Sequence, residues 1–178
     1  MAWGNIICNI ACSITASFMF IFLVLFLFKP KIKISPFICK GRYNHSEPGE
    51  YYFIKLVNTS FFSAYDVSIE LLEVDSYKTE GGTNNRFRPL TLVLGKISHI
   101  PGYRPTWMDN KNATHAIVVR TQDNINQILS NDYNSVQLKV SLRHGLTGLV
   151  KVHTKEYCDA DQIKAGKFKF GSKFVSIG

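Results

Sequence analysis

The run of residues 6–28, which contains no charged side chain, constrains this chain more than any other feature of its sequence. An α-helix rises about 1.5 Å per residue, so this run is slightly longer than the hydrocarbon core of a bilayer, which is about 30 Å thick. Its second half consists of phenylalanine, leucine, isoleucine, valine and one methionine. The sequence therefore predicts an N-terminal transmembrane anchor, a single helix, within residues 1–28.

The competing interpretation of this run is a cleaved secretory signal. Such a signal carries a basic residue before its apolar stretch and small residues at its cleavage site. This chain has no basic residue before the run, and the run leads into Phe28, Lys29 and Pro30. We therefore expect the anchor to remain uncleaved.

Basic residues follow the apolar run, and none precedes it. Lysine and arginine close to the end of a transmembrane helix are retained in the cytoplasm. We expect a single-pass protein of the cell membrane, with its N-terminus outside and its C-terminal domain in the cytoplasm. Triplets of the glycosylation type begin at Asn44, Asn58 and Asn112. They would matter only on the opposite side of the membrane, and such triplets arise by chance in a chain rich in Asn, Ser and Thr.

The formal net charge of +8 is concentrated in two basic segments. Residues 29–42 form a basic juxtamembrane segment, and further lysines follow near the C-terminus, where Lys167 and Lys169 alternate with phenylalanines. Such clusters beside an anchor favour anionic lipid as a partner over nucleic acid, although an ordinary solvated strand face is the alternative for the C-terminal group. Contact with the membrane surface is predicted for Lys29, Lys31, Lys33, Lys40, Arg42, Lys167, Lys169 and Lys173.

Apolar and polar residues alternate in several short segments beyond the anchor. Strands are predicted at residues 51–57, 64–74, 90–94, 97–100, 116–120, 136–142 and 149–153. Residues 77–88 are expected to form a flexible hairpin-type loop, residues 123–130 one short helix capped by Thr121 or Asp123, and residues 168–177 a final hairpin around Gly171. Short strands at this spacing are typical of a sandwich rather than of βαβ units. We expect a mainly β fold in which an immunoglobulin-like sandwich forms one domain, residues 31–178.

Two stretches resemble the cytoplasmic domain of inward-rectifier potassium channels. Residues 54–58, Ile-Lys-Leu-Val-Asn, followed by residues 64–71, are similar to the strand pair near the start of that domain. Four residues near the C-terminus are similar in order and spacing to a run of the same family: Tyr157, Ile163, Gly166 and Phe168. The resemblance implies a cytoplasmic sandwich that assembles around an axis and responds to anionic lipid or other ligands.

The chain lacks the parts that form the pore of that family. A potassium pore needs two membrane helices that flank a filter whose backbone carbonyls replace the hydration of the ion. This sequence has one apolar run and no Thr-x-Gly-Tyr-Gly segment, and Gly102 and Tyr103 lie far from the run. The chain alone is therefore not expected to form such a channel, and the resemblance transfers no ligand-binding residue.

The residues that carry catalysis or bind metals form no recognisable motif. The five histidines show neither a helical pair nor a cysteine pair at zinc spacing, and we expect them at the surface or in turns. Cys39 or Cys158, brought close to His153, is the candidate for a nucleophilic site, and both cysteines are otherwise expected to be reduced. The acidic residues from Glu156 to Asp161 are interpreted as a solvated turn rather than a cation site. We therefore expect no enzymatic activity, no metal and no cofactor.

Three polar residues in the first half of the apolar run, Asn9, Ser13 and Ser17, are candidates for an interface between helices, because polar side chains hydrogen-bond across helices in lipid. Cys8 and Cys12 share a helical face and are sites either of acylation or of ordinary packing. The sequence favours a non-enzymatic membrane protein whose sandwich serves interaction, assembly or sensing, as a homo-oligomer or with a partner membrane protein. The alternatives are a membrane effector whose helices form a pore or disrupt the bilayer on a signal, and a membrane-tethered enzyme.

Overall fold

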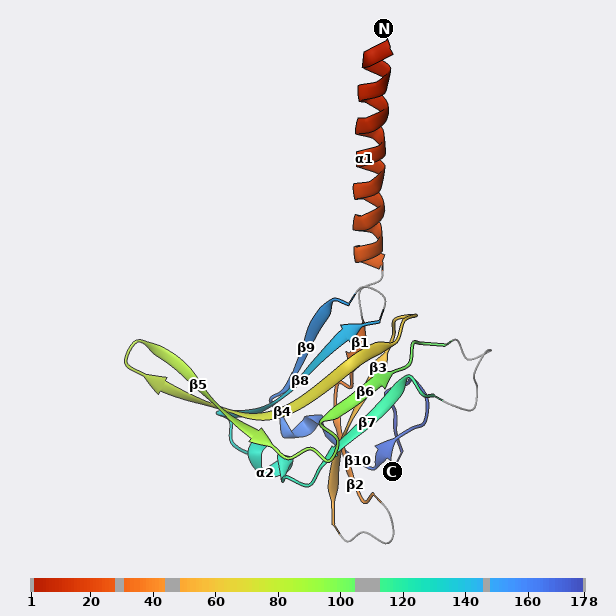
Figure 1. Cartoon of the computed structure of the whole chain (residues 1–178). Helices are drawn as coiled ribbons and strands as arrows, with labels where there is room; N and C mark the ends of the chain where they lie inside the picture. The colour runs from red at the N-terminus through yellow and green to blue at the C-terminus, as the bar shows by residue number, and fades with distance from the viewer. Residues whose placement is uncertain (1, 28–30, 44–48, 105–112, 146–147, 178) are drawn as a thin grey trace.

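The computed structural model describes residues 2–27, 31–43, 49–104, 113–145 and 148–177. The apolar run forms the helix α1 (Ala2–Leu27), which extends away from the β-sheets (Figure 1). Its stretch Trp3–Leu25 is long and apolar enough to cross a membrane, and the apolar part of this stretch is not buried against the rest of the chain. An apolar helix that finds no protein core to cover it is stable only in an apolar solvent or against a partner.

Sheet A, one of two five-stranded sheets, is built around one central strand. Its strands are β1 (Ile32–Ile34), β2 (Ile38–Gly41), β3 (Tyr51–Asn58), β7 (Ala116–Thr121) and β10 (Ile163–Ala165). β7 pairs antiparallel with one side of β3, and β1 and β2 share the other side end to end. β10 adds to β2 in parallel. Pro36 separates β1 from β2, because a proline cannot donate to the ladder of a continuous strand.

Sheet B contains the longer strands and follows the connectivity of an immunoglobulin-like sandwich. Its strands are β4 (Ala64–Thr79), β5 (Gly82–Leu90), β6 (Lys96–Ile100), β8 (Asn134–His144) and β9 (Val150–Tyr157). The strand order is β5, β4, β8, β9. β6 pairs with the first part of β4, on the same edge where β5 pairs with the second part. The predicted fold, mainly β with an N-terminal helix, a sandwich and one short helix, is confirmed.

A bulge near the start of β4 changes which side chains enter the core. The register with β8 shifts between Tyr65 and Ser68, and Asp66 has a positive φ of 47°. Strict alternation predicts Tyr65 and Val67 on the same buried face. In the structure Val67 is buried and Tyr65 is exposed, because the extra residue of the bulge moves its neighbours to the other face.

The core lies between the two sheets. It is formed by the inward residues of β3, β4 and β8, with Ile125 and Leu129 closing one end. Tyr157 at the end of β9 is also completely buried, and its hydroxyl donates to the carbonyl oxygen of Ser35 at 2.8 Å. This bond satisfies the one polar atom of the tyrosine side chain, as burial requires. It also ties sheet B to the break between β1 and β2.

The predicted short helix forms as α2 (Ile125–Leu129), with Ile125 and Leu129 buried as the periodicity indicates. Its N-cap is Asn124 and not Thr121 or Asp123. The Asn124 side chain accepts from the amide of Gln127 and from the hydroxyl of Tyr52 at 2.9 Å. The cap therefore anchors the helix to sheet A as well as satisfying an amide of its first turn.

The hairpin predicted at residues 77–88 is confirmed, but it consists of regular strands and not of a flexible loop. β4 continues to Thr79 and β5 begins at Gly82, so this segment is a regular hairpin that projects from the sandwich (Figure 1). The prediction of a strand at residues 90–94 is wrong beyond Leu90, which ends β5. Residues 75–87, which we call the arm, have almost no buried side chain, and this removes the hydrophobic alternation by which strands are recognised.

The C-terminal hairpin around Gly171 is confirmed. β11 (Lys167–Phe168) pairs with β12 (Ser176–Ile177), after the single 3₁₀ turn η1 (Ala160–Gln162) and β10. Gly171 has a positive φ of 94°, which a residue without a Cβ adopts readily. We call residues 167–177 the C-terminal strap.

Candidate functional site

The C-terminal strap covers the face of sheet A that points away from sheet B. All residues of β3 are buried, on both faces of the strand. Ile54 and its alternate neighbours lie in the core between the sheets. Tyr51 and Phe53 lie instead in a smaller cluster against which Phe168 and Phe174 of the strap pack. This outer face, with the strap across it, holds two of the cavities described below.

A buried lysine holds the strap in place. Lys55 of β3 is 2% exposed, and its Nζ donates to the carbonyl oxygens of Lys169 at 2.7 Å and Lys173 at 3.1 Å. Among the described residues no carboxylate forms an ion pair with it. Burial lowers the pKa of Lys55. A buried ammonium is tolerated when its hydrogen bonds are satisfied, so the strap and Lys55 depend on each other.

The first cavity on this face has a volume of about 550 Å³ and lies between β1, the end of β3 and the strap. We call it the basic cavity, because Lys33 and Lys173 both line it. Lys33 is six residues beyond Leu27, the last residue of α1. An extended chain spans at most about 3.5 Å per residue, so this lysine is within about 20 Å of the end of the helix. The full lining is Lys33, Val57, Thr59, Tyr103, Ser172, Lys173, Phe174 and Val175.

Asn58 is buried between Val57 and Thr59, two residues that line one wall of the basic cavity. Its side chain is 1% exposed, and its Nδ2 donates to the carbonyl oxygens of Phe62 at 2.9 Å and Pro101 at 3.0 Å. Its Oδ1 accepts from the amide of Ser60. An amide nitrogen with these partners cannot carry a glycan in the folded protein. The triplet at Asn58 is therefore structural, whereas those at Asn44 and Asn112 lie outside the described residues.

Thr59 ties the beginning of the domain to the same wall. Its amide and its Oγ1 donate to the carbonyl oxygen of Lys31, at 2.7 and 2.9 Å. Tyr103, on the facing segment, donates its amide to the carbonyl oxygen of Ser60 at 2.7 Å. Gly102 permits this approach, since a Cβ there would lie 2.2 Å from the carbonyl oxygen of Phe61. The cavity is therefore lined by backbone that is fixed by hydrogen bonds.

The second cavity has a volume of about 290 Å³, and we call it the arginine groove. The guanidinium carbon of Arg120 lies 3.3 Å from the ring centre of Tyr43 and 5.3 Å from that of Tyr51. Gln122 donates to the hydroxyl of Tyr51 at 2.7 Å and so helps to fix its ring. Stacking on aromatic rings orients a guanidinium and leaves its N–H edge available. The full lining is Tyr43, Phe53, Val93, Leu94, Val118 and Arg120.

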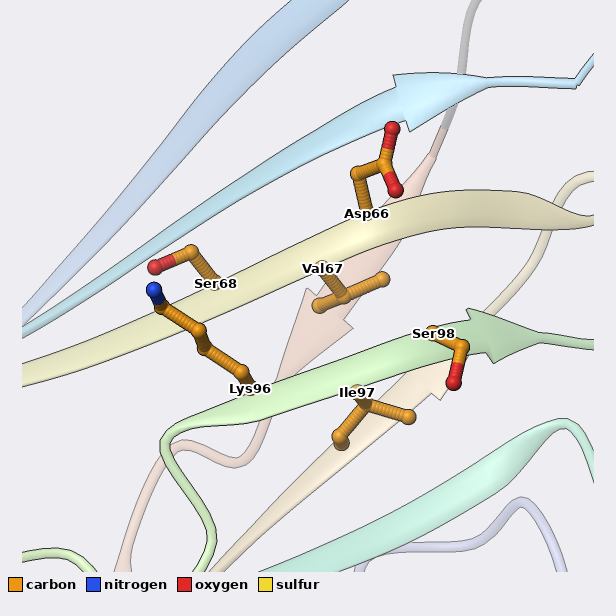
Figure 2. Close-up of a pocket in the computed structure, with 6 residues that line it drawn as sticks. All are labelled: Asp66, Val67, Ser68, Lys96, Ile97 and Ser98. Atoms are coloured by element: carbon orange, nitrogen blue, oxygen red, sulfur yellow. The ribbon is translucent and has the colours of Figure 1, made fainter.

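The third cavity lies on the other sheet, where β4 pairs with β6, and has a volume of about 420 Å³. Figure 2 shows Ser68 and Lys96 pointing toward each other from these strands, while Asp66 is turned toward β8. The carboxylate of Asp66 forms an ion pair with Arg143 of β8 at 3.3 Å. The residues that line this cavity include no histidine, and its one basic side chain is that of Lys96.

The eight basic residues for which membrane contact is predicted do not all lie at the same end of the sandwich. Lys29 lies outside the described residues. Lys33 of β1 is in register with Val57, whereas Lys40 of β2 is in register with Tyr52, five residues away along β3. At about 3.4 Å per residue, the two lysines are separated by about 17 Å along the sheet.

Only part of the juxtamembrane segment therefore lies near the helix. Lys31 and Lys33 are exposed at the end of the sandwich where the chain leaves α1. Arg42 is exposed at the opposite end, beyond β2, and Lys40 at that end forms an ion pair with Glu50 at 2.7 Å. Lipid contact stays a prediction for all of these residues, and the geometry favours the first pair.

The lysines of the strap are also divided. Lys167 donates to the carbonyl oxygen of Tyr43 at 2.8 Å, toward the end of the sandwich that holds Lys40. Lys169 and Lys173 have exposed side chains while their carbonyl oxygens bind Lys55. Of the three, Lys173 lines the basic cavity together with Lys33.

The polar residues of α1 are partly satisfied within the helix. The hydroxyls of Ser13 and Ser17 donate to the carbonyl oxygens of Asn9 and Ser13, each at 2.9 Å. Thr15 makes the same kind of bond to Ala11. Asn9, Ser13 and Ser17 lie on one helical face, because they are spaced by four residues. Asn9 differs from the two serines, because its carboxamide has two donors and an acceptor and one such bond cannot satisfy them all.

The candidate nucleophiles are poorly placed for catalysis. Cys39 is completely buried, and burial raises the pKa of its thiol to about 11 despite the nearby Lys164 and Lys55. Cys158 is exposed, but partial burial and the carboxylates of Glu156 and Asp159 raise the pKa of its thiol as well. A nucleophilic cysteine needs a lowered pKa. Within the described part of the chain, no three His, Cys, Asp or Glu side chains are grouped as a metal site.

The expectation that histidines lie at the surface or in turns is wrong for His144. It is 1% exposed at the end of β8, its ring packs edge-on against Phe62 at 5.3 Å, and burial lowers its pKa. His115 is also buried, in the turn before β7, with its ring 5.2 Å from that of Tyr103. Both histidines have structural positions in the sandwich.

Comparisons with known proteins add no function. No protein-family model matches the chain, and no curated protein matches it. One solved structure that it is similar to is described as the ApaA protein from Bordetella pertussis, at 12% sequence identity and a TM-score of 0.32. The similarity covers 72% of this chain and 90% of that chain. A TM-score this low supports no argument about fold or function.

Sequence reasoning missed the residues that organise the outer face of sheet A. Lys55 is the one charged residue in the apolar and aromatic run 51–57, and nothing in the sequence shows that its side chain is buried. Asn58 begins a glycosylation-type triplet, and nothing in the sequence indicates that its side chain is buried and hydrogen-bonded. Arg120 stacks on Tyr43, more than seventy positions away in sequence, and no local pattern relates the two.

Proposed function

We propose that this chain is a non-enzymatic, single-pass membrane protein whose β-sandwich serves as an interaction, assembly or sensing module on the cytoplasmic side of the cell membrane. One observation carries the proposal. α1 is apolar and exposed along its length, and the carbonyl of Lys31, four residues beyond it, is already bound to Thr59 of the sandwich. Such a short connection keeps the module against the bilayer.

Anionic lipid is the proposed partner of the end of the sandwich nearest the helix. Lys31 and Lys33 are exposed there, and Lys33 and Lys173 line the basic cavity. Each basic residue near an anionic surface contributes about 1 kcal/mol to membrane attraction. Lys31 and Lys33 also belong to the basic flank that favours the cytoplasmic side, so the proposed orientation and the proposed lipid contact involve the same surface.

The test is the accessibility of Cys158, which is exposed, compared with Cys39, which is completely buried. In a variant with Cys8→Ala and Cys12→Ala, a membrane-impermeant maleimide should leave Cys158 unlabelled in intact cells and label it after permeabilisation. Cys39 should react only after denaturation. Labelling of Cys158 in intact cells would overturn the cytoplasmic assignment, and recovery of the chain in the soluble fraction would overturn the anchor.

A membrane effector is the second candidate, and Asn9 is the observation that favours it. A carboxamide in lipid finds its partners on other helices, which would assemble α1 into an oligomer. Expression of the chain in cells that report membrane potential tests this candidate, with Asn9→Leu as the variant. Loss of potential that Asn9→Leu prevents supports an effector, whereas an unchanged potential leaves the interaction module.

A further inference from the structure

We propose that the arginine groove and the neighbouring edge of β7 bind an extended acidic segment of a partner protein, as an added strand. This inference deepens the proposed function and rests on it, because it gives the interaction module a class of partner. It concerns the outer face of sheet A, on the other side of the strap from the basic cavity.

The edge of β7 has backbone groups that face away from its sheet. β7 pairs with β3 on one side, and no other described strand pairs with it. The carbonyl oxygen of Arg120 accepts from the amide of Val93 at 3.0 Å, so it points away from β3. Backbone groups two residues apart in a strand point the same way, so the N–H and C=O of Val118 also face outward. The carbonyl oxygen of Arg120 is bound to Val93 and the amide of Ala116 donates to Ala113, so an added strand would pair with this edge mainly at Val118.

The side chains beside this edge have the composition of a binding surface. Val118 is 43% exposed, and Val93 and Leu94 are exposed beside it. Arg120 lies against Tyr43 at the other side of the groove, and no described carboxylate forms an ion pair with it. Tyrosine and arginine dominate the energetics of interfaces, and a stacked guanidinium offers a paired N–H edge to a carboxylate. The groove therefore fits a segment that carries both apolar and acidic side chains.

The exposed edge of β9 is less suited to this role. β9 also exposes valines, but Lys151 and Lys155 alternate along it. Lysines on an edge strand discourage the addition of another strand. The net charge of +8 adds a general preference for acidic partners without choosing among surfaces, so the choice of β7 depends on the local geometry.

The experiment uses the full-length chain in detergent micelles and fluorescence anisotropy at physiological salt. The probe is a short labelled peptide that alternates glutamate with valine, and its counterpart carries lysine in place of glutamate. We expect saturable binding of the acidic peptide only. Arg120→Glu should weaken binding by at least about tenfold, in line with the loss of a central arginine from an interface. Arg86→Glu is the matched control, because Arg86 also lies over a tyrosine, Tyr77, but on the arm.

A second pair of variants tests the strand edge. Val118→Asp should abolish binding, whereas Val152→Asp, on the edge of β9 and similarly exposed at 49%, should not change it. Two further acidic peptides, one N-methylated at its odd positions and one at its even positions, distinguish backbone pairing from side-chain contact alone. We expect one of these two peptides to lose binding. Each variant is first shown to keep the circular dichroism spectrum and the thermal unfolding midpoint of the parent.

The proposal is overturned by the absence of saturable binding of the acidic peptide, by equal binding of the basic peptide, or by equal effects of Arg120→Glu and Arg86→Glu. Full binding of both N-methylated peptides would remove the added strand. No bilayer takes part in this assay, so its failure leaves the cysteine labelling result standing. A failure of the labelling test would in turn leave the peptide measurement unchanged, and the two proposals fail separately.

Discussion

Lys55 links two backbone carbonyls of the strap to the centre of sheet A with a single ammonium group. A charged group so deeply placed contributes only while the strap is closed, because water replaces the carbonyls when it opens. The residue is therefore a sensitive probe of whether the strap is part of the cooperative fold.

We expect Lys55→Ala to lower the free energy of unfolding by about 2 to 4 kcal/mol, through the cavity it leaves and the two carbonyls it orphans. Hydrogen exchange should increase most at the amide of Lys169, which donates to the carbonyl oxygen of Val175. Lys139→Ala, at an exposed position on β8, is the control and should change stability by less than about 0.5 kcal/mol. Unchanged exchange in the strap of the Lys55 variant would show that packing alone holds it.

Cys39 gives the fold a defined dependence on alkaline pH. Its thiol has a pKa raised from 9.0 to about 11 by burial. Between these values the unfolded chain loses this proton and the folded chain keeps it, so stability falls as the pH rises from 9 to 11. Tyr157, whose pKa burial also raises, acts in the same direction at higher pH.

The prediction for Cys39 is therefore a difference measurement. The stability advantage of the parent over Cys39→Ala should shrink by about 2 kcal/mol between pH 8.5 and pH 11, at about 1.4 kcal/mol for each pKa unit. Denaturant unfolding at a series of pH values, followed by tryptophan fluorescence, measures it. Parallel pH profiles for the two proteins would mean that the thiol is not desolvated in the folded state.

At the scale of elements, the arm shows what limits prediction from sequence. Strands at residues 51–57 and 136–142 were predicted correctly, the first from its run of aromatic and aliphatic residues and the second from its alternation in hydrophobicity. The arm has both faces in solvent, and its strands are held by their ladder and by contacts such as Ser76 Oγ to Asn85 Oδ1 at 2.8 Å. The bulge at Asp66 and the buried Lys55 escaped prediction for another reason, since both depend on partners distant in sequence.

We expect the arm to be dispensable for folding. Joining Ser76 to Asn85 through an Asn-Gly turn, in place of residues 77–84, should change the free energy of unfolding by less than about 1 kcal/mol, because these residues bury almost no surface. Thermal unfolding followed by circular dichroism is the measurement. The control keeps the arm but replaces Phe87 with serine. A large loss of stability in the shortened chain, absent from the control, would show that the arm packs against something in the intact molecule.

At the scale of the whole molecule, we expect the charge beside α1 to decide which way the chain crosses the membrane. Replacing Lys29, Lys31 and Lys33 with glutamine and adding lysines before Trp3 should weaken or invert the orientation, because lysine and arginine near the helix ends dominate this choice. Maleimide labelling of Cys158 in intact cells should then appear. Glutamine replacement of Lys151, Lys155 and Lys139, far from the helix in sequence, is the control. Unchanged protection of Cys158 in the first variant would show that other features set the topology.

The two hydrogen bonds from Thr59 to Lys31 leave only residues 28–30 between the helix and the domain. In an anchored chain, so short a tether confines the sandwich to a layer about as thick as itself along the membrane. A partner held in the same membrane then meets the arginine groove at an effective concentration that reaches the millimolar range for short tethers. An interaction that is weak but measurable for a free peptide would then be occupied most of the time at the membrane. The affinity measured with the peptide in micelles therefore understates how fully the groove is occupied when both components share one bilayer.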